Sequence, residues 1–314
     1  MMRCEIILPC RGELPGNLRR TVRNIRNTMG PDDGLTVLMD GLHPDVEYHV
    51  EGMASIQLFD RARGPGWCRH WGITHSKAKY VVLVDGHMAF TPGWVDEICR
   101  HLAVPAHAKD VTCCHTVELD AHWRAVRSTN PFAGAHLELK SPREVRKNWW
   151  LNAIWNLDPL ESGVVGAPLG ACYGMRWTWY HNMGAPLSIL GAWGGEEELL
   201  GACSWLMGGR VWLLPTRCGH IFNAPNLRPP MTVRERHEMW TNQYAMLYAL
   251  PVPPDERAAL WLWLDRVNSR PEIVAECVAA RMDAITHLKT ALMFAPRTWD
   301  DLKADGIIRP WRMV

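Results

Sequence analysis

The stretch Tyr80–Trp94, YVVLVDGHMAFTPGW, decides the fold that we expect for this chain. Its first residues, Tyr80–Val84, are apolar and largely β-branched, which predicts a strand buried on both faces. Asp85 and His87 follow where that strand ends, and alternate residues on an extended backbone point the same way. Open α/β sheets bind ligands at strand ends, so we expect a divalent metal here that holds a diphosphate. The alternative is that Asp-Gly forms only a turn.

Length and composition limit the possible classes of protein. The chain has 314 residues, 47% hydrophobic, with a formal net charge of +1, which suits one large α/β domain with an appendage. A charge near zero requires any nucleic-acid or membrane contact to come from a local patch. No apolar run approaches the roughly 18 residues of a membrane span, and no signal-peptide pattern opens the chain. Ten cysteines without a CxxC pair indicate reduced thiols, so we expect a cytoplasmic protein.

The N-terminal part predicts a βαβ unit and therefore a parallel sheet. Cys4–Pro9 is the first strand, and apolar residues at helical spacing from Leu14 to Met29 predict an amphipathic helix that ends at Gly30-Pro31. Leu35–Met39 is the second strand, and Ser55–Phe59 is a weaker third one.

Polar residues that follow the second and third strands have two interpretations each. Asp40 lies where nucleotide-binding sheets often bind a ribose hydroxyl, but it could equally cap a turn or a helix. The segment Arg61–Ala78 is rich in arginine, glycine and tryptophan. Either Arg63 or Arg69 faces a nucleotide, or the segment is the solvated start of a helix.

The middle of the chain is less regular. We expect a helix over Trp94–Leu102 and a strand over Asp110–Leu119. Trp123–Asp158 shows no clean periodicity and predicts a long excursion that includes the strand-like Ala135–Leu139. Small residues in Val164–Met175 allow backbone to approach a ligand.

A turn at Trp193-Gly194-Gly195 leads into a helix that begins with Glu196-Glu197-Glu198 and runs through Met207. Acids in a first turn suit the helix dipole, and at a sheet edge they also point at a ligand. We expect a strand over Gly209–Pro215, then Cys218–Phe222, where His220 taken alone would be an ordinary core histidine.

The rest of the chain begins with a segment that holds three prolines, Asn223–Thr232, which predicts an ordered or closable loop. From Val233 the sequence is rich in tryptophan, tyrosine and leucine and predicts helices to the C-terminus.

Taken in order, these motifs resemble those of GT-A glycosyltransferases, and among them the polypeptide N-acetylgalactosaminyltransferases and their bacterial and viral relatives. The resemblance covers about residues 4–250. It is carried by EIILPCR with Leu18–Val22, LTVLMDG, Cys68–Ile73 with Ala78 and YVVLVDGH, Gly93-Trp94, Trp193–Glu196, Gly208–Val211 with Cys218–Phe222, and Arg234–Trp240 with Tyr244 and Tyr248. Three features depart from the family: Gly86 in the metal motif, Glu-Glu-Glu where the family has Glu-Asn, and the lack of a lectin domain and of a membrane anchor.

The resemblance implies an α/β fold of the GT-A (Rossmann-like) type, with a mostly parallel sheet flanked by helices. It also divides the chain into a catalytic domain, residues 1–232, and a helical C-terminal extension, residues 233–314, packed on it.

The resemblance further implies metal-dependent transfer of a sugar from a UDP-sugar. Asp85, His87 and His220 would bind Mn²⁺ or Mg²⁺, and their mixed oxygen and nitrogen ligands suit Mn²⁺. Residues expected to bind the donor are Pro9, Arg11, Asp40, Arg63, Arg69, Gly170, Ala171 and Arg228, the last on a loop that would close over it. Trp193 and Glu196 would face the sugar and the acceptor.

The family precedent is retention of the anomeric configuration, in which the departing phosphate takes the acceptor proton and no side-chain base is needed. In inverting relatives an acid at the same helix start is the base, a role open here to Glu197 or Glu198.

The acceptor is the least determined feature of the sequence. Trp123–Trp155 interleaves basic and aromatic residues, a pattern that suits phosphate contact and base stacking, and viral glycosyltransferases that resemble this family modify hydroxymethylated pyrimidines in phage DNA. A base modified in this way has to leave the duplex. We expect 5-hydroxymethylcytosine in DNA as the acceptor. The alternatives are a polysaccharide or protein acceptor, a non-catalytic nucleotide-sugar or DNA-binding module, and an ordinary packed insertion.

Overall fold

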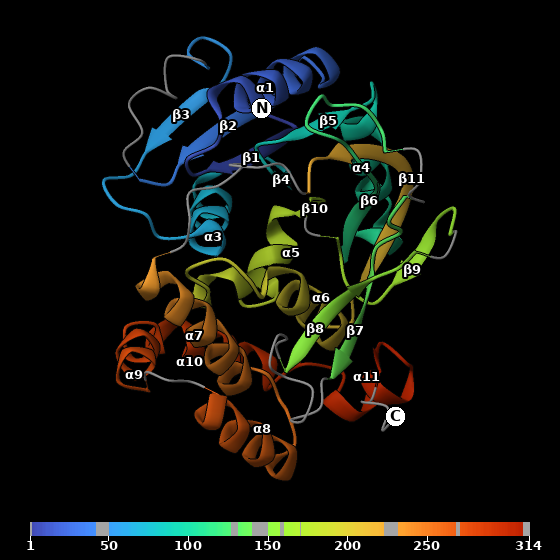
Figure 1. The fold of residues 1–314 in the computed structure, drawn as a ribbon. Helices are drawn as coiled ribbons and strands as arrows, with labels where there is room; N and C mark the ends of the chain where they lie inside the picture. Colours follow the sequence, from blue (N-terminus) through green and yellow to red (C-terminus); the bar gives the residue numbers. More distant parts are fainter. Residues whose placement is uncertain are drawn as a thin grey trace.

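The protein folds around one large mixed sheet with helices on both faces (Figure 1). This fold is seen in a computed structural model, which describes residues 2–41, 50–126, 131–139, 150–157, 160–169, 171–222, 232–267 and 271–309. The strands of the large sheet are β1 (Cys4–Cys10), β2 (Asp33–Met39), β3 (Ser55–Leu58), β4 (Tyr80–Val84), β5 (Met88–Phe90), β6 (Asp110–Glu118), β9 (Gly163–Val165), β10 (Cys172–Arg176) and β11 (Arg210–His220).

The order of strands confirms the mostly parallel sheet. Among the described residues it is β3-β2-β1-β4-β10-β6-β11-β5, with β9 paired to β11. β3, β2, β1 and β4 are parallel neighbours, and so are β6 and β11, whereas β10, β5 and β9 are antiparallel to their partners. The carboxyl ends of β1, β2 and β4 therefore meet at one edge, as the sequence predicted for the ligand site.

Helices cover the two faces of the sheet because side chains alternate along each strand. In β1, Ile6 and Leu8 join the core under one face, and Ile7 joins the core under the other. The first core also takes the buried side of the predicted amphipathic helix, Leu18, Val22 and Ile25. The helices are α1 (Pro15–Thr28) and α4 (Trp94–Ala103) on that face, α3 (Pro65–His75), α5 (Trp177–Asn182) and α6 (Glu196–Leu206) on the other, and the C-terminal α7 (Val233–Ala249), α8 (Pro254–Val267), α9 (Pro271–Ala279), α10 (Met282–Leu292) and α11 (Trp299–Ala304).

The segment Val164–Met175 was expected only as backbone close to a ligand, and that expectation was incomplete. Its last residues begin β10, which lies antiparallel between β4 and β6 in the middle of the sheet. The sequence CYGMR lacks β-branched residues, so it carries little strand signal. Close packing against α4 explains the glycine at position 174, because a Cβ there would lie 2.8 Å from Cγ2 of Ile98.

The strand predicted over Gly209–Pro215 is longer than expected. β11 continues to His220, with a shift in register between Leu214 and Arg217. Pro215 marked a false end, because proline removes a ladder hydrogen bond and is accommodated at such irregularities. The register with β5 pairs His220 with Met88, which brings the imidazole beside the Asp85–His87 turn.

The excursion between β6 and β9 holds two strands where one was expected. β7 (Ala135–Leu139) is confirmed, but β8 (Leu151–Trp155) pairs with it antiparallel. Their small sheet also contains β12 (Ile308–Arg309), so the C-terminal part of the chain is not purely helical. The domain boundary at residue 232 stays a prediction.

Two expectations from composition can be compared with the structure. All ten cysteines are free and buried. No helix in the described part of the chain is long and apolar enough to cross a bilayer.

The approach of α3 to the sheet depends on Gly72, where a Cβ would lie 2.6 Å from Cγ2 of Ile7. We predict that Gly72→Leu lowers the free energy of unfolding by about 1–3 kcal/mol, the usual range for overpacking. The control is Gly16→Ala in α1, where a Cβ meets nothing within 4 Å, and it should cost nothing. Urea denaturation measures both, and equal stability of the two variants would contradict the close packing.

Candidate active site

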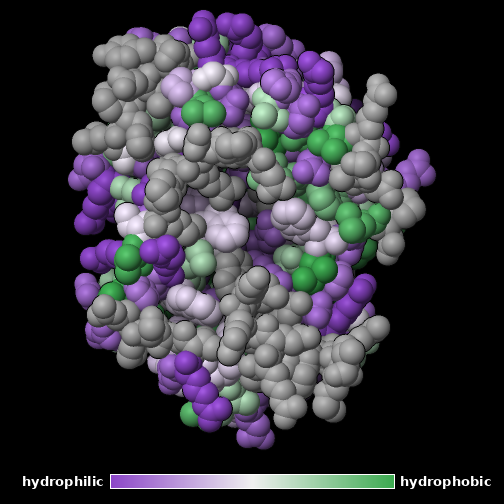
Figure 2. All heavy atoms as spheres, in the orientation of Figure 1, coloured by the Kyte–Doolittle hydropathy of each residue, from purple (hydrophilic) through white to green (hydrophobic). Residues whose placement is uncertain are grey.

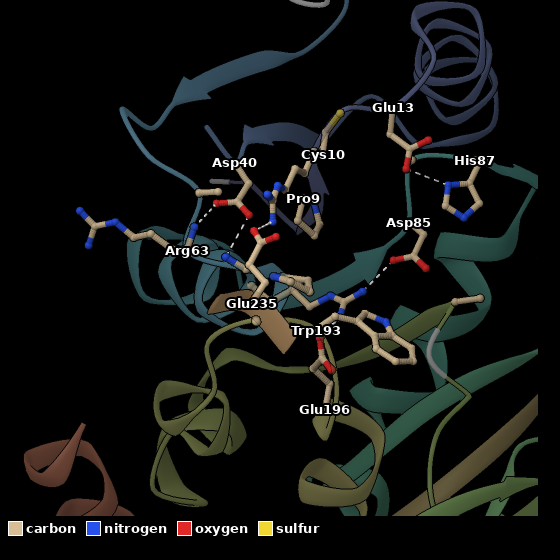
Figure 3. A pocket seen from close by; sticks show the side chains of 18 of the residues that line it. Pro9, Cys10, Glu13, Asp40, Arg63, Asp85, His87, Trp193, Glu196 and Glu235 are labelled. Atoms are coloured by element: carbon tan, nitrogen blue, oxygen red, sulfur yellow. Dashed lines mark hydrogen bonds and ion pairs between the residues drawn. The ribbon is translucent and has the colours of Figure 1, made fainter. Parts of the chain in front are cut away.

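A cavity of about 360 Å³ opens at the carboxyl ends of β1, β2 and β4, within the size range of small-molecule sites (Figure 3). The starts of α6 and α7 close its other side. Most of the expected site residues that the structure describes line it: Pro9, Arg11, Asp40, Arg63, Arg69, Asp85, His87, Ala171, Trp193, Glu196, Glu197 and His220. Glu198, the alternative to Glu197 as a base, is not among the lining residues. Gly170 and Arg228 lie outside the described residues.

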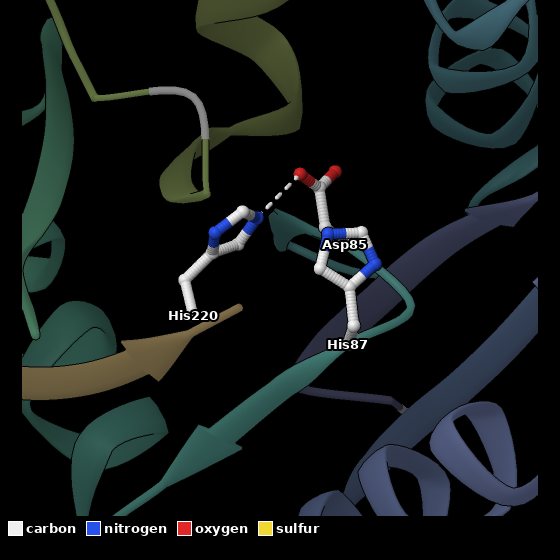
Figure 4. Close-up of side chains that lie close together, drawn as sticks. All are labelled: Asp85, His87 and His220. Carbon is white, nitrogen blue, oxygen red and sulfur yellow. Dashed lines mark hydrogen bonds and ion pairs between the residues drawn. The ribbon is translucent and has the colours of Figure 1, made fainter. Parts of the chain in front are cut away.

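Asp85, His87 and His220 come together at the end of β4 (Figure 4). Oδ2 of Asp85 lies 3.3 Å from Nε2 of His220, and the two imidazole rings are 4.6 Å apart. One ligand atom from each residue lies within 4.8 Å of the others. Burial opposes ionisation of Asp85, but the hydrogen bond with His220 and the charge of Arg69 hold its pKa below the usual value. A carboxylate with two imidazoles is a donor set that a divalent transition metal accepts.

Glu13 fixes the orientation of His87, a contact that no sequence pattern predicted. Its Oε1 lies 3.0 Å from Nδ1 of His87 in a buried contact. An ionised carboxylate can only accept here, so Nε2 keeps its lone pair, and that nitrogen is buried without a hydrogen-bond partner among the described residues. Carboxylate–histidine pairs of this kind are the usual second layer of metal sites.

Gly86, the departure inside the metal motif, makes room for this arrangement. A Cβ at position 86 would lie 2.9 Å from Cγ of Glu13. The glycine therefore lets Glu13 reach His87.

Arg69 joins the metal cluster to the start of α6. Its guanidinium donates from Nη2 to Oδ1 of Asp85 at 2.7 Å and from Nη1 to Oε1 of Glu196 at 2.8 Å. The side chain of Arg69 is only 6% exposed, as is that of Glu196. We expected either Arg63 or Arg69 to face the nucleotide, which stays a prediction. Arg69 lines the cavity with its charge between two carboxylates, because a buried guanidinium needs compensating acceptors.

The three acids at the start of α6 have different environments, which the sequence could not separate. Glu196 also accepts from the backbone N–H of Gly194 at 2.9 Å, so both of its oxygens are used. Glu198 is buried and accepts from the backbone N–H of Ala153 in β8. Glu197 lines the cavity, and it accepts a hydrogen bond from the indole N–H of Trp155 at 3.4 Å. Burial, followed by the charges of Glu198 and Glu196, raises the pKa of Glu197 well above its ordinary value.

The opposite end of the cavity is built on Asp40. Its two oxygens accept backbone N–H groups from Arg63 at 2.6 Å and Gly64 at 2.9 Å (Figure 3). Asp40 thus anchors the turn into α3, which is the capping alternative, while it also lines the cavity. Arg63 stacks over the ring of Trp67, with Cζ 4.4 Å from the centroid.

Arg11 pairs with Glu235 across the cavity, between the end of β1 and the first turn of α7. Glu235 also completes a capping box with Thr232, so it has a helix-forming role as well. The sequence indicated Arg11 for donor binding and missed Glu235, whose partner lies more than two hundred residues away.

An aromatic wall of three rings, Phe132, Trp155 and Phe222, stands beside the metal cluster. The ring centroids of its members lie 5.0–5.3 Å apart, and the ring of Phe222 is 4.2 Å from that of His220. Trp193, which is 44% exposed, lines the same cavity. Flat rings of this kind offer stacking surfaces to a sugar or a base.

We predict that Arg69→Met costs about 3 kcal/mol of unfolding free energy, because it leaves two carboxylates without their shared cation. Adding Glu196→Gln should cost less than the sum of the two single changes, since the residues interact directly. Urea denaturation of the full double-mutant cycle tests this, with the exposed Arg266→Met on α8 as the control. Additive costs would show that the bridge contributes no interaction energy.

Comparison with known proteins agrees with this geometry. Residues 5–158 match glycosyl transferase family 2. The chain is 26% identical over 279 residues to human polypeptide N-acetylgalactosaminyltransferase 15, covering 76% of this chain and 40% of that protein. It is 25% identical over 212 residues to putative polypeptide N-acetylgalactosaminyltransferase 13 of Drosophila melanogaster, covering 59% and 35%. The chain thus spans well under half of these relatives.

Among solved structures, GalNAc-T7, crystallised with UDP, GalNAc and Mn²⁺, superimposes with a TM-score of 0.63 over 90% of this chain and 54% of that one, at 15% identity. This likeness concerns the fold. Together with the family match, it shows that residues 5–158 match glycosyl transferase family 2 within a chain that has the GT-A fold and resembles the polypeptide N-acetylgalactosaminyltransferases.

Proposed function

We propose that the protein transfers a sugar from a UDP-sugar to a hydroxyl acceptor and needs a divalent metal to do so. The observation that carries this proposal is the convergence of Asp85, His87 and His220 at the strand-end edge of the sheet, inside a cavity of suitable size. The presence of UDP, GalNAc and Mn²⁺ in the GalNAc-T7 crystal structure supports the same choice of donor and cation.

We propose one orientation of the UDP-sugar in the cavity, with its diphosphate at the metal cluster and its nucleoside at the opposite end. The metal cluster receives the diphosphate, where a bound Mn²⁺ or Mg²⁺ stabilises the charge of the departing nucleotide. Pro9, Asp40 and Arg63 surround the nucleoside at the far end, and Ala171 presents backbone to the sugar. Arg228 on its loop remains part of this proposal as the group that reaches the diphosphate.

The acceptor side is formed by Glu197, Trp193 and the aromatic wall. Glu196 is committed to Arg69 and Gly194, so we assign it a positioning role. Glu197 has one weak contact and borders the cavity, which suits an acceptor for the hydrogen bond of the incoming hydroxyl. We favour retention, in which the leaving phosphate takes the proton, and the anomeric configuration of the product decides this point.

For the acceptor we propose the 5-hydroxymethyl group of 5-hydroxymethylcytosine in DNA. The aromatic wall next to His220 supports this choice because an extruded base needs a stacking surface. Of the basic residues that motivated the proposal in the sequence, Arg124 is exposed, whereas Arg127, Lys140, Arg143, Arg146 and Lys147 lie outside the described residues. Of the tryptophans that lay beside them, Trp155 is 37% exposed, but Trp150 is fully buried and offers no stacking surface. A protein or polysaccharide hydroxyl is the competing acceptor, and a non-catalytic binding module is the competing class.

Metal dependence can be tested with His87→Ala. We predict loss of Mn²⁺ binding, measured by electron paramagnetic resonance, and a drop in UDP-sugar turnover of about 100-fold or more, with an unchanged circular dichroism spectrum. The matched control is His136→Ala, a histidine that also lies near a carboxylate, 3.8 Å from Glu138, outside the cavity. Full Mn²⁺ affinity in His87→Ala would remove the histidine from the metal site.

Glu197→Gln should reduce transfer to acceptor by roughly 10–100-fold, the worth of one hydrogen bond to a charged group, and leave hydrolysis of the donor unchanged. Only the ionised form accepts strongly, and burial raises its pKa. Wild-type transfer should therefore rise with pH through that raised pKa, and the rising limb should disappear in the variant. An identical pH profile in both proteins would rule out this role.

The acceptor itself is tested by incubating the protein with Mn²⁺ and a panel of UDP-sugars. Hydroxymethylated DNA, unmodified DNA and a Ser/Thr peptide serve as alternative acceptors. We expect a mass increase of one hexose or N-acetylhexosamine on the hydroxymethylated DNA alone. Modification of the peptide instead would show that the acceptor is a protein hydroxyl and not DNA. Donor hydrolysis without transfer to any of them would contradict all the acceptors tested and leave only the proposed use of a UDP-sugar with a divalent metal.

A further inference from the structure

The outer face of α1 carries a cluster of positive charges, although the net charge of the chain is close to zero. Arg19, Arg20, Arg23 and Arg26 are exposed on this helix, which contains no acidic residue, while the net charge of the whole chain is +1. We call these four residues the arginine face. None of them forms an ion pair with another residue in the described part of the chain.

The arginine face has room for an anion. Arg19, Arg20 and Arg23 border a shallow surface hollow together with Gly16, and a Cβ at Gly16 would meet nothing within 4 Å. Figure 1 places α1 at the upper edge of the molecule, and Figure 2 shows hydrophilic residues gathered along that edge.

A short chain of contacts connects the arginine face to the metal cluster. Cζ of Arg20 lies 4.7 Å above the ring of Trp123, whose indole N–H donates to Asn17 on the same helix. Trp123 packs against the small cluster of Leu119 and Ile221, and the backbone N–H of Ile221 donates to the carbonyl of His87 at 3.2 Å. The arginine face is therefore linked through Trp123 to the segment that carries His87 and His220.

We propose that the arginine face binds the phosphate backbone of duplex DNA and so presents a base to the cavity. This inference rests on the DNA acceptor of the proposed function. Guanidinium groups suit phosphate oxygens because their paired donors match the oxygen spacing. Phosphate contacts of this kind position a duplex without reading its sequence.

A membrane surface fits this helix less well. Helices that lie on membranes expose an apolar face to the lipid. In α1 that face, formed by Leu18, Val22 and Ile25, is fully buried against the sheet. Only the charged side of the helix is free to bind a partner.

The dimensions agree with a duplex. Arg19 and Arg26 are seven residues apart, about 10 Å along a helix, and a duplex presents about one negative charge per 1.7 Å of its axis. Arg19, Arg23 and Arg26 follow the i, i+4, i+7 spacing of one helix face, so these three can contact phosphates at once. Each such contact contributes about 0.9 to the slope of log K against log salt concentration, so three contacts contribute roughly 3.

The test is DNA binding without donor or metal, measured by fluorescence anisotropy with a labelled duplex over a series of salt concentrations. We predict that Arg19→Gln, Arg23→Gln and Arg26→Gln combined weaken binding by about tenfold or more near physiological salt and reduce the salt slope by roughly 3. The control carries Arg266→Gln, Lys289→Gln and Arg309→Gln, which lower the net charge equally at the opposite end of the molecule and are exposed.

An unchanged slope in the α1 variant, or an equal loss in the control, would overturn the inference. Equal binding to anionic phospholipid vesicles, lost in the same variant, would also overturn it in favour of a membrane. Donor hydrolysis by the α1 variant separates this result from the proposed function. If hydrolysis persists at the wild-type rate while DNA binding is absent in both proteins, the DNA partner fails and the transferase stands.

Discussion

The structure of the site depends on one buried guanidinium held between two carboxylates. Arg69 on α3 bridges Asp85 at the end of β4 and Glu196 at the start of α6. α3 and β4 are neighbours in the sequence, whereas α6 follows more than one hundred residues later. A charge this well buried is tolerated only while both acceptors are present, so the bridge fixes the position of Asp85, the carboxylate that we propose binds the metal, relative to the start of α6.

The strand pairing of the sheet positions the other candidate metal ligands. β10 and β6 lie between β4 and β11 in the sheet, and β11 also pairs with β5. That pairing brings His220 to Asp85 from a position more than one hundred residues later. Glu13 steadies His87 from the other side. Each candidate ligand thus has its own support: Arg69 for Asp85, Glu13 for His87, and the pairing of β11 with β5 for His220. Separate supports suit a site that must keep its geometry while substrates bind and leave.

The sequence predicted those parts of the fold and the site that depend on patterns within one short segment. The apolar run before Asp85, the amphipathic α1 and the turn at Trp193–Gly195 each carry their own signal, and the order of motifs indicated the fold. It could not predict contacts between distant segments: Glu13 with His87, Arg11 with Glu235, or the distinct environments of the three adjacent glutamates. β10 was missed because it lacks β-branched residues and its Gly174 packs against Ile98 on α4. The end of β11 was predicted too early because a proline resembles a strand end.

The central claim is that Asp85, His87 and His220 share one cation that also holds the diphosphate. Anomalous diffraction at the manganese edge, from crystals grown with UDP and MnCl₂, tests it most directly. The account predicts one strong peak in contact with Oδ2 of Asp85 and the two imidazoles, next to the β-phosphate. Manganese bound elsewhere, with UDP in the cavity and no peak at these three side chains, would contradict it.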